Sequence, residues 1–514
     1  MNKYFLNIID FLLLGYTAMA GSYLVLQNEL DSFAVAEWCI FLLCYFVIRR
    51  IPNKQWCLWG IALLGMTEAI VAFCQRMYWI DNTYSIFDIT GTFANPGPLG
   101  GFLAVTTTVT FGLYLGYRKR LWVKYSLLPI FILLLIIIVQ TDSRAGWLAV
   151  LLGIGSFSLE KIKKESDSFS NFQKVSVLIL TTLFLFFVYY YKKDSADGRL
   201  LIWRVSVEMI ADAPFLGHGV GAFEKQYMHY QARYFDVHPS SRYVRLADNI
   251  AYPYNEFLRI GVELGLVGLA LVIGIIVCVF KYVPYRGNNK IYLGAFVSWF
   301  TFSMFSYPFH VPLLWLLLPI LLGGMQCRKS MCVRVGYGFK FIEWLVGLVC
   351  LSFIMQNGYN HYLLKHKVEQ LYSSSRQDVE EAVLYIEQHR LDLQSDSQLF
   401  DIYAQYCYQN FPLPKRKTIL EEAVAVIPNS ELYCDLGDTY KALNQIEKAV
   451  SCYVMASNMV PNRILPNYKL FCLYREIGDT IKMRKAGEKA LNTQLKVEST
   501  KTLRIKGDLK RSLG

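Results

Sequence analysis

The chain has 514 residues, of which 54% are hydrophobic and 18% charged, and its mean hydropathy is +0.30. A soluble protein of this length needs far more polar surface, so the composition excludes an ordinary soluble enzyme and indicates a polytopic membrane protein. The formal net charge of +12 does not indicate nucleic-acid binding, because the basic residues lie in short loops between apolar segments and form no patch on a soluble domain.

Long apolar segments follow one another along the first two thirds of the chain. About eleven of them approach the roughly 17–25 residues that a helix needs to cross the hydrocarbon core of a membrane. We therefore predict an all-α fold in which residues 1–358 form a polytopic membrane helix bundle. The apolar segments cover residues 5–26, 33–48, 57–74, 97–117, 125–141, 145–159, 175–191, 260–280, 291–306, 311–325 and 339–356.

Basic side chains recur after every second apolar segment and set the predicted orientation. Because loops rich in Lys and Arg stay in the cytoplasm, the N-terminus is predicted to be cytoplasmic and the other loops to face outward. An odd number of spans then carries the C-terminal region to the outer, periplasmic side. The basic loops contain Arg49, Arg50 and Lys54; Arg118, Lys119, Arg120 and Lys124; Lys161, Lys163, Lys164 and Lys174; Lys281, Arg286 and Lys290; and Arg328, Lys329, Arg334 and Lys340.

Two short outward turns precede predicted spans. Asn95 stands before a Pro-Gly pair, a pattern typical of a turn and a helix start whose free amides suit an anion. A plain helix cap is the alternative interpretation. Ser143 and Arg144 follow Asp142 in the second turn. Arg144 either binds a ligand at the membrane boundary or pairs with Asp142.

A long outward segment, residues 192–258, separates the seventh and eighth spans. Arg199 and Trp203 are four residues apart and share one face of a predicted helix, and Arg204 lies on the adjacent face. The planar guanidinium group matches phosphate oxygens in a bidentate manner. A glycine-rich turn around His218 follows, and its glycines allow the backbone to approach a ligand closely. The segment is therefore predicted to bind an anion.

The outward segment ends in Tyr254-Asn255-Glu256. Glu256 is a candidate general base if it faces the pocket. Arg259 and Glu263 have i, i+4 spacing and can form an ion pair with each other instead. The cysteines have no metal-ligand spacing, so the sequence predicts neither a metal nor a cofactor.

Residues 359–514 are more polar and predict a short helical-repeat domain with a period of about 34 residues. The clearest unit places Gly437, Tyr440, Ala449 and Tyr453 at the spacing of a tetratricopeptide repeat. Small residues at such positions let two antiparallel helices approach each other, and the aromatic residues fill the remaining space. A solenoid of this kind binds a partner polypeptide in its concave face, or it serves as a spacer. The sequence leaves both readings open.

The four outward motifs, taken in order, resemble the bacterial O-antigen ligase and polymerase superfamily, which includes protein O-oligosaccharyltransferases. The resemblance covers residues 85–325 and rests on GTFANPGPLGGFLA, TDSRAGWLA, GRLLIW…PFLGHGVGAF and YNEFLRIGVELGLVG. It implies a metal-independent, inverting glycosyltransferase of the bacterial inner membrane. Its donor would be a glycan linked to undecaprenyl diphosphate, and its acceptor a hydroxyl group on the periplasmic face.

The resemblance also implies roles for individual residues. The two arginines that hold the donor diphosphate in the family fall on Arg144 and Arg199, and Arg204, Ser143 and Asn95 are further candidates for this contact. Many members have His-Asn-Glu where this chain has Tyr-Asn-Glu. Tyrosine is a poor base because its usual pKa is about 10. The candidate catalytic residues are therefore Glu256, Tyr254, Asn255 and His218, with His310 as a further possible base.

The acceptor is left open as a glycan, lipid A-core or a protein. Ligation or protein glycosylation is favoured over polymerisation, because outward repeats suit an extended acceptor or a protein partner. A transporter for lipids or sugars is the alternative from another functional class. It would need ionisable residues at mid-membrane or paired broken helices, and the spans contain few charged residues.

Overall fold

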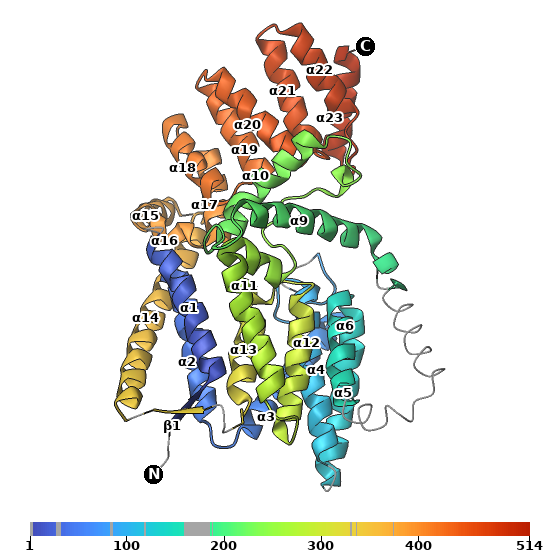
Figure 1. Ribbon diagram of the computed structural model, residues 1–514. Coiled ribbons are helices and arrows are strands. Elements are labelled where there is room, and N and C mark those ends of the chain that lie inside the picture. The colour runs from blue at the N-terminus through green and yellow to red at the C-terminus, as the bar shows by residue number, and fades with distance from the viewer. Residues whose placement is uncertain are drawn as a thin grey trace.

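The computed structural model describes residues 4–26, 32–82, 86–117, 120–158, 186–187, 189–328, 332–335, 337–373 and 375–513. Helices dominate these residues, and the apolar ones form a bundle in the lower half of the molecule (Figure 1). The bundle contains α1 (Ile8–Leu26), α2 (Ser32–Arg50), α3 (Gln55–Arg76), α4 (Pro96–Gly116), α5 (Leu121–Gln140), α6 (Arg144–Gly155), α11 (Glu256–Tyr282), α12 (Asn288–Ser303), α13 (Pro312–Gly324) and α14 (Tyr337–Gln370).

These helices coincide with ten of the eleven predicted apolar segments. The seventh segment, 175–191, falls mainly on residues outside the described part of the chain. Within that part, α3, α4, α5 and α11 are long and apolar enough to cross a membrane, judged by length and composition. The prediction of a helical, multi-pass membrane protein is confirmed, whereas the number of spans and their orientation stay predictions.

Helix α4 lies at the centre of the bundle, and most of its side chains are buried. The hydroxyl groups of its threonines donate hydrogen bonds to backbone carbonyl oxygens of the same helix; Thr107 Oγ1, for example, donates to the carbonyl oxygen of Leu103 at 2.6 Å. Glycines bring its first turn against α6. A Cβ atom on Gly146 would lie 2.8 Å from the carbonyl oxygen of Gly100, so a larger residue would separate the two helices. This close approach places the first two outward motifs side by side.

Two short strands, which the sequence did not predict, join the start of the chain to the start of α14. Strand β1 (Tyr4–Asn7) pairs antiparallel with β2 (Cys332–Val335). Four residues are too few for an alternating pattern to stand out beside long apolar helices. The first predicted span, 5–26, therefore begins as a strand and becomes helical at Ile8.

The long outward segment contains two further helices, α9 (Lys193–Asp212) and α10 (Ala222–Val237), and the 3-10 turn η2 (Val244–Leu246). Helix α9 lies across the upper end of the bundle (Figure 1). The turn between α9 and α10 binds α11 where that helix is interrupted at Gly265. There the amide of Leu266 donates to Pro214 O at 2.8 Å, and the amide of His218 donates to Val262 O at 2.8 Å.

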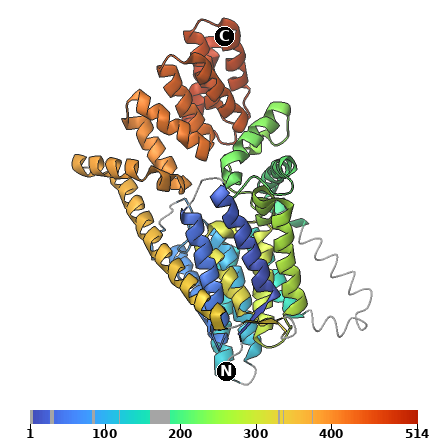
Figure 2. The same cartoon turned by 60° about the vertical axis from the view of Figure 1, so that its left-hand side comes forward.

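The C-terminal region is a series of helices stacked above α9 and α10. Helix α14 runs without a break through the predicted domain boundary at 358/359 and slants along the outside of the bundle (Figure 2). The helices that follow are α15 (Arg376–Gln388), α16 (Arg390–Gln394), α17 (Ser397–Asn410), α18 (Leu413–Val426), α19 (Ser430–Ala442), α20 (Ile446–Met459), α21 (Ile464–Glu476), α22 (Thr480–Leu491) and α23 (Thr500–Leu513).

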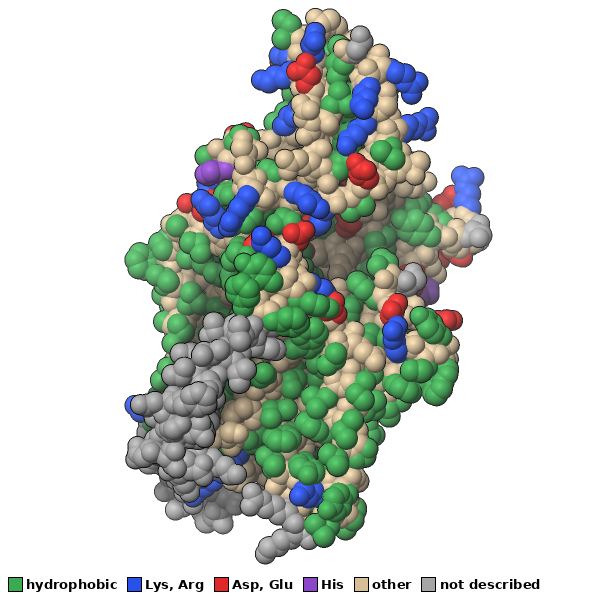
Figure 3. All heavy atoms as spheres, turned by 90° about the vertical axis from the view of Figure 1, so that its right-hand side faces the viewer, with side chains coloured by type: hydrophobic (Ala, Val, Ile, Leu, Met, Phe, Trp, Pro, Cys, Tyr) green, Lys and Arg blue, Asp and Glu red, His purple; other side chains and the backbone are tan. Residues whose placement is uncertain are grey.

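Helices α19 and α20 pack as the repeat pattern predicts. The Gly437 position faces the ring of Tyr453, and Ala449 and Ala456 are fully buried in the same interface. Membership of the tetratricopeptide family stays a prediction. Figure 3 shows charged side chains gathered on this upper part of one face, hydrophobic side chains on the lower part, and a hollow between the two.

Candidate functional site

Two helix N-termini meet at the upper end of the bundle and position the first arginine. Asn95 caps α4, because its Oδ1 accepts a hydrogen bond from the amide of Gly97 at 2.8 Å. Ser143 caps α6 by accepting from the Gly146 amide, and its hydroxyl donates to Gly97 O at 3.3 Å. Both polar side chains are therefore used in local structure, and their effect is to fix the backbone from which Arg144 projects.

Arg144 is the first residue of α6, and its Nη1 donates to the carbonyl oxygen of Tyr189 at 3.5 Å. The carboxylate of Asp142 forms an ion pair with Lys192 at the start of the outward segment. Asp142 also acts electrostatically on Arg144, whose charged form it favours, so this carboxylate has two basic neighbours and its pairing with Arg144 stays a prediction.

Arg199 lies on α9, and two groups hold its side chain. Its Nη1 donates to Phe305 O at 2.8 Å, and its guanidinium lies 5.2 Å from the centre of the Tyr254 ring. One turn further along α9, Trp203 Nε1 donates to Pro253 O at 3.0 Å and ties the helix to the segment before α11. Burial lowers the pKa of the Arg199 guanidinium, and the neighbouring charge of Arg144 lowers it further. A pair of partly desolvated cations of this kind is stabilised by an anion.

Arg144 and Arg199 line one cavity of about 240 Å³, which we call the arginine cavity. None of the described residues that line it carries a carboxylate. The walls are largely apolar, so a charged group inside is poorly screened by water and the two guanidinium groups attract an anion strongly. The remaining lining residues are Ala145, Leu148, Tyr189, Ala196, Leu200, Trp203 and Phe305.

A second cavity of about 400 Å³ also borders Arg199, and we call it the polar cavity. Arg199 therefore lines both cavities. Unlike the arginine cavity, the polar cavity contains charges of both signs. It is lined by Asp194, Ser195, Gly198, Arg199, Leu201, Ile202, Gln231, Arg245, Leu246, Asp248, Ile250, Tyr254 and Lys496.

Tyr254 and Asn255 lie beside Arg199, but neither is arranged as a base. Burial raises the pKa of Tyr254, although Arg199 opposes the shift, so the phenol stays protonated at neutral pH. Asn255 caps α11 by accepting from the amides of Phe257 and Leu258 at 2.9 and 3.1 Å. The positive φ of Tyr254, +53°, turns its ring toward Arg199 and Tyr307.

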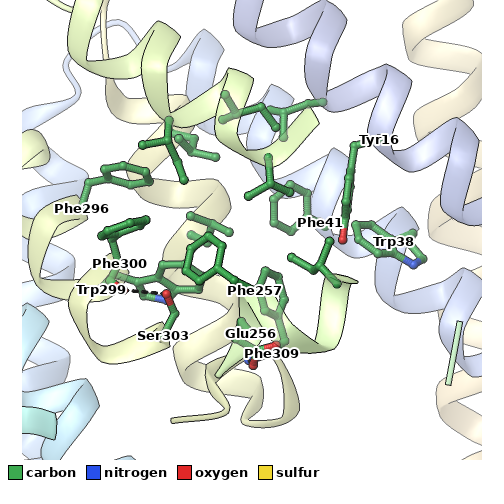
Figure 4. Close-up of a pocket in the computed structure, with 17 residues that line it drawn as sticks. Tyr16, Trp38, Phe41, Glu256, Phe257, Phe296, Trp299, Phe300, Ser303 and Phe309 are labelled. Carbon is green, nitrogen blue, oxygen red and sulfur yellow. Dashed lines mark hydrogen bonds between the residues drawn. The ribbon is translucent and has the colours of Figure 1, made fainter. Parts of the chain in front are cut away.

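Glu256 is engaged elsewhere. Its Oε2 accepts from Arg259 Nε at 2.7 Å, its Oε1 accepts from the Phe309 amide at 3.0 Å, and Glu263 binds the same arginine at 2.9 Å. The predicted pair of Arg259 and Glu263 is thus present, with Glu256 as a third member. Glu256 borders a small apolar cavity of about 70 Å³ inside the bundle, where Figure 4 shows it beside Phe309 and among aromatic rings. The structure therefore argues against Glu256 as the general base.

We expect Glu256→Gln to leave kcat for glycan transfer, the reaction that the motif resemblance implies, within about threefold of the unmodified protein. Loss of a general base would lower kcat by about 10²–10⁴-fold. The free energy of unfolding should fall by about 1–3 kcal/mol, because one charge-assisted hydrogen bond to Arg259 is weakened. Glu263→Gln is the matched control, since it weakens the other bond to the same arginine. A fall in kcat above a hundredfold in Glu256→Gln alone would return the base role to Glu256.

Two other predicted residues lie outside both cavities. His218 Nε2 bonds to the carbonyl oxygen of Met209 at 2.8 Å, within the turn that binds α11. Arg204 lies 5.2 Å above the Tyr234 ring and lines a separate, open hollow with Arg242. The glycines around His218 approach the backbone of α11: a Cβ atom on Gly217 would lie 2.5 Å from Glu263 O. Their predicted role of approaching a ligand is replaced by this helix contact.

Sequence reasoning missed most of the polar cavity. Asp194, Arg245, Asp248 and Lys496 come from α9, from the loop around η2 and from a position far along the C-terminal region. No spacing rule connects such distant segments, so only a folded chain reveals them. Among the described residues, no group of three or more His, Cys, Asp or Glu side chains is arranged to hold a metal ion.

Comparisons with known proteins agree with the motifs. Residues 129–273 match a family model described as O-antigen ligase, and this range contains Arg144, Arg199 and Tyr254. A Rickettsia typhi protein named as a "putative polysaccharide ligase" is 25% identical over 322 residues, which are 52% of this chain and 73% of that protein. A protein of the same description from Rickettsia conorii is 24% identical over 353 residues, or 59% of this chain and 80% of its own length. No solved structure matches the chain. The chain is thus similar to a family described as O-antigen ligase, over a range that contains its arginine motifs, and to proteins named as putative polysaccharide ligases.

Proposed function

We propose that the chain is a membrane glycosyltransferase that moves a glycan from undecaprenyl diphosphate to an acceptor hydroxyl on the periplasmic face of the bacterial inner membrane. The observation that carries this proposal is the arginine cavity. Arg144 and Arg199 are 55 positions apart in the sequence, yet they line one cavity whose described lining residues include no carboxylate. A diphosphate is the anion that two such guanidinium groups bind best, since each group can hold oxygens in a bidentate manner. The match to the O-antigen ligase model supports the same choice.

The transfer needs one displacement. The acceptor oxygen forms a bond to the anomeric carbon while the bond from that carbon to the diphosphate oxygen breaks, which inverts the configuration. The electron pair of the broken bond leaves on the diphosphate, whose growing charge the two arginines stabilise. The hydroxyl proton passes to a base on the acceptor side. Of the two carboxylates that line the polar cavity, Asp248 is held by Lys496 and Arg463, so Asp194 is the candidate base.

Purified protein in detergent tests the proposal with the lipid-linked glycan of its host membrane as donor. We expect transfer to continue in EDTA, because arginine charges replace a divalent cation. A donor with the same glycan on undecaprenyl monophosphate should react at least about tenfold more slowly, since half of the bound anion is lost. Loss of transfer in EDTA that Mg²⁺ restores would contradict the arginine mechanism. Equal rates with both donors would contradict recognition of a diphosphate.

A further inference from the structure

The C-terminal region forms part of the wall of the polar cavity. Lys496, which follows α22, lines the cavity and forms an ion pair with Asp248 at 2.6 Å. Arg463 binds the other oxygen of the same carboxylate at 3.3 Å. The C-terminal region thus contacts the loop beside Arg199 directly.

A buried asparagine from the same region fixes the backbone of that loop. Asn462 is only 5% exposed, and its Nδ2 lies within hydrogen-bonding distance of three carbonyl oxygens, those of Val244, Arg245 and Ala247, at 3.2, 3.0 and 2.6 Å. The fully buried Gln231 adds a second connection, because its Nε2 donates to both Met459 O and Asp248 O. The loop that carries Arg245 and Asp248 into the cavity therefore depends on the C-terminal region for its shape.

The lining of the polar cavity fits a saccharide. Its carboxylates accept hydrogen bonds, its cations and Gln231 donate them, and a sugar hydroxyl does both. Apolar side chains and the Tyr254 ring offer surfaces for the C–H faces of a sugar ring. A volume of about 400 Å³ lies within the range of about 300–1,000 Å³ that is usual for small-ligand sites.

We propose that the polar cavity binds the acceptor as a saccharide, and that the C-terminal region completes this site through Lys496 and Asn462. The inference rests on the proposed function, because it takes the arginine cavity as the donor site. Arg199 lines both cavities, so a saccharide in the polar cavity would lie next to a donor that the same guanidinium holds. A displacement needs the acceptor hydroxyl close to the anomeric carbon, and this shared residue supplies that proximity. Lys496 contacts the sugar, and Asn462 is a positioning residue.

The test uses the full-length protein and two separate probes. Undecaprenyl diphosphate, titrated by thermal shift, reports the donor site alone. A free oligosaccharide, released from the cell-surface polysaccharide of the host, serves as acceptor in the transfer assay. We expect Lys496→Met and Asn462→Ala to raise KM for this acceptor by about tenfold, the effect of one lost charge-assisted hydrogen bond or of a displaced loop. Affinity for undecaprenyl diphosphate should not change. Lys510→Met removes a charge from the same region outside the cavity and should change neither value.

The outcomes separate the two proposals. An unchanged KM in Lys496→Met, which alters an exposed side chain and should fold normally, would overturn the saccharide site even if Asn462→Ala fails to fold. Transfer to a serine-rich peptide, with no transfer to the oligosaccharide, would overturn it in favour of a polypeptide acceptor. Absence of undecaprenyl diphosphate binding in the unmodified protein would instead overturn the proposed function.

Discussion

Replacing Arg199 with alanine is expected to lower kcat for glycan transfer by about 10²–10³-fold, the effect of removing one group that stabilises charge in a transition state. Its guanidinium lines both cavities and is already oriented by Phe305 O and the Tyr254 ring. Arg199→Lys keeps the charge but loses the planar fork, so about a tenfold loss should remain. Initial rates at saturating donor and acceptor measure the effect.

Arg204 provides the comparison for this variant. It lies on the same helix five positions later, and sequence motifs alone made it a candidate for the same anion. Because it lines a separate hollow over Tyr234, Arg204→Ala should lose less than about threefold in kcat. Equal losses in the two alanine variants would mean that the arginine cavity is not the donor site. A loss confined to KM would assign Arg199 to ground-state binding and not to the departing charge.

Gly265→Ala is expected to prevent the protein from accumulating in a folded, monodisperse form. Gly265 interrupts α11 with φ +62° and ψ −162°, a conformation that is essentially restricted to glycine. A Cβ atom there would also overlap the backbone of Phe215, in the turn that joins α9 to α10. The strain costs about 1–3 kcal/mol, and displacing a backbone that donates and accepts hydrogen bonds adds to it.

Gly274→Ala is the matched control on the same helix. A Cβ atom at Gly274 would meet the side chain of Leu12 at 3.7 Å, an ordinary contact, so this variant should be tolerated. Size-exclusion profiles in detergent and thermal denaturation of both variants provide the measurement. A Gly265→Ala protein as stable as Gly274→Ala would show that the interruption of α11 is not needed to hold the turn.

Long periodic features of the fold were predictable, because each apolar segment carries its own signal. Ten predicted segments are helices, and the order of the outward motifs identified Arg144 and Arg199 as candidates before their shared cavity was visible. Local chemistry was harder to assign. Glu256 was predicted to be a base and Glu263 to be the partner of Arg259, yet Glu256 is three residues from the same arginine, a spacing that also allows an ion pair.

Contacts between distant segments were beyond the reach of the sequence. Five residues along a helix rotate a side chain well away from its neighbour, so whether Arg204 shares the site of Arg199 depends on what packs around α9. No sequence pattern marked Lys496 as a residue of the site, since it lies in a polar segment that resembles many others in the C-terminal region. The hydrogen bonds of Asn462 show, once the chain is folded, that the loop near Arg245 is held by the C-terminal helices.

Because α14 is continuous across the predicted domain boundary, it determines where the chain can be truncated without disrupting the helix bundle. Cutting the gene at the composition change near residue 358 would leave a severed helix on the outside of the bundle and expose its apolar stump. Truncation after Gln370 keeps that helix whole, yet it still removes Asn462 and its hydrogen bonds to the carbonyl oxygens of the loop beside Arg199. The shortened protein would lack the contacts that hold the loop with Arg245 and Asp248 at the polar cavity. A fall in its activity would therefore reflect a distorted cavity and could not be attributed to the loss of a partner protein.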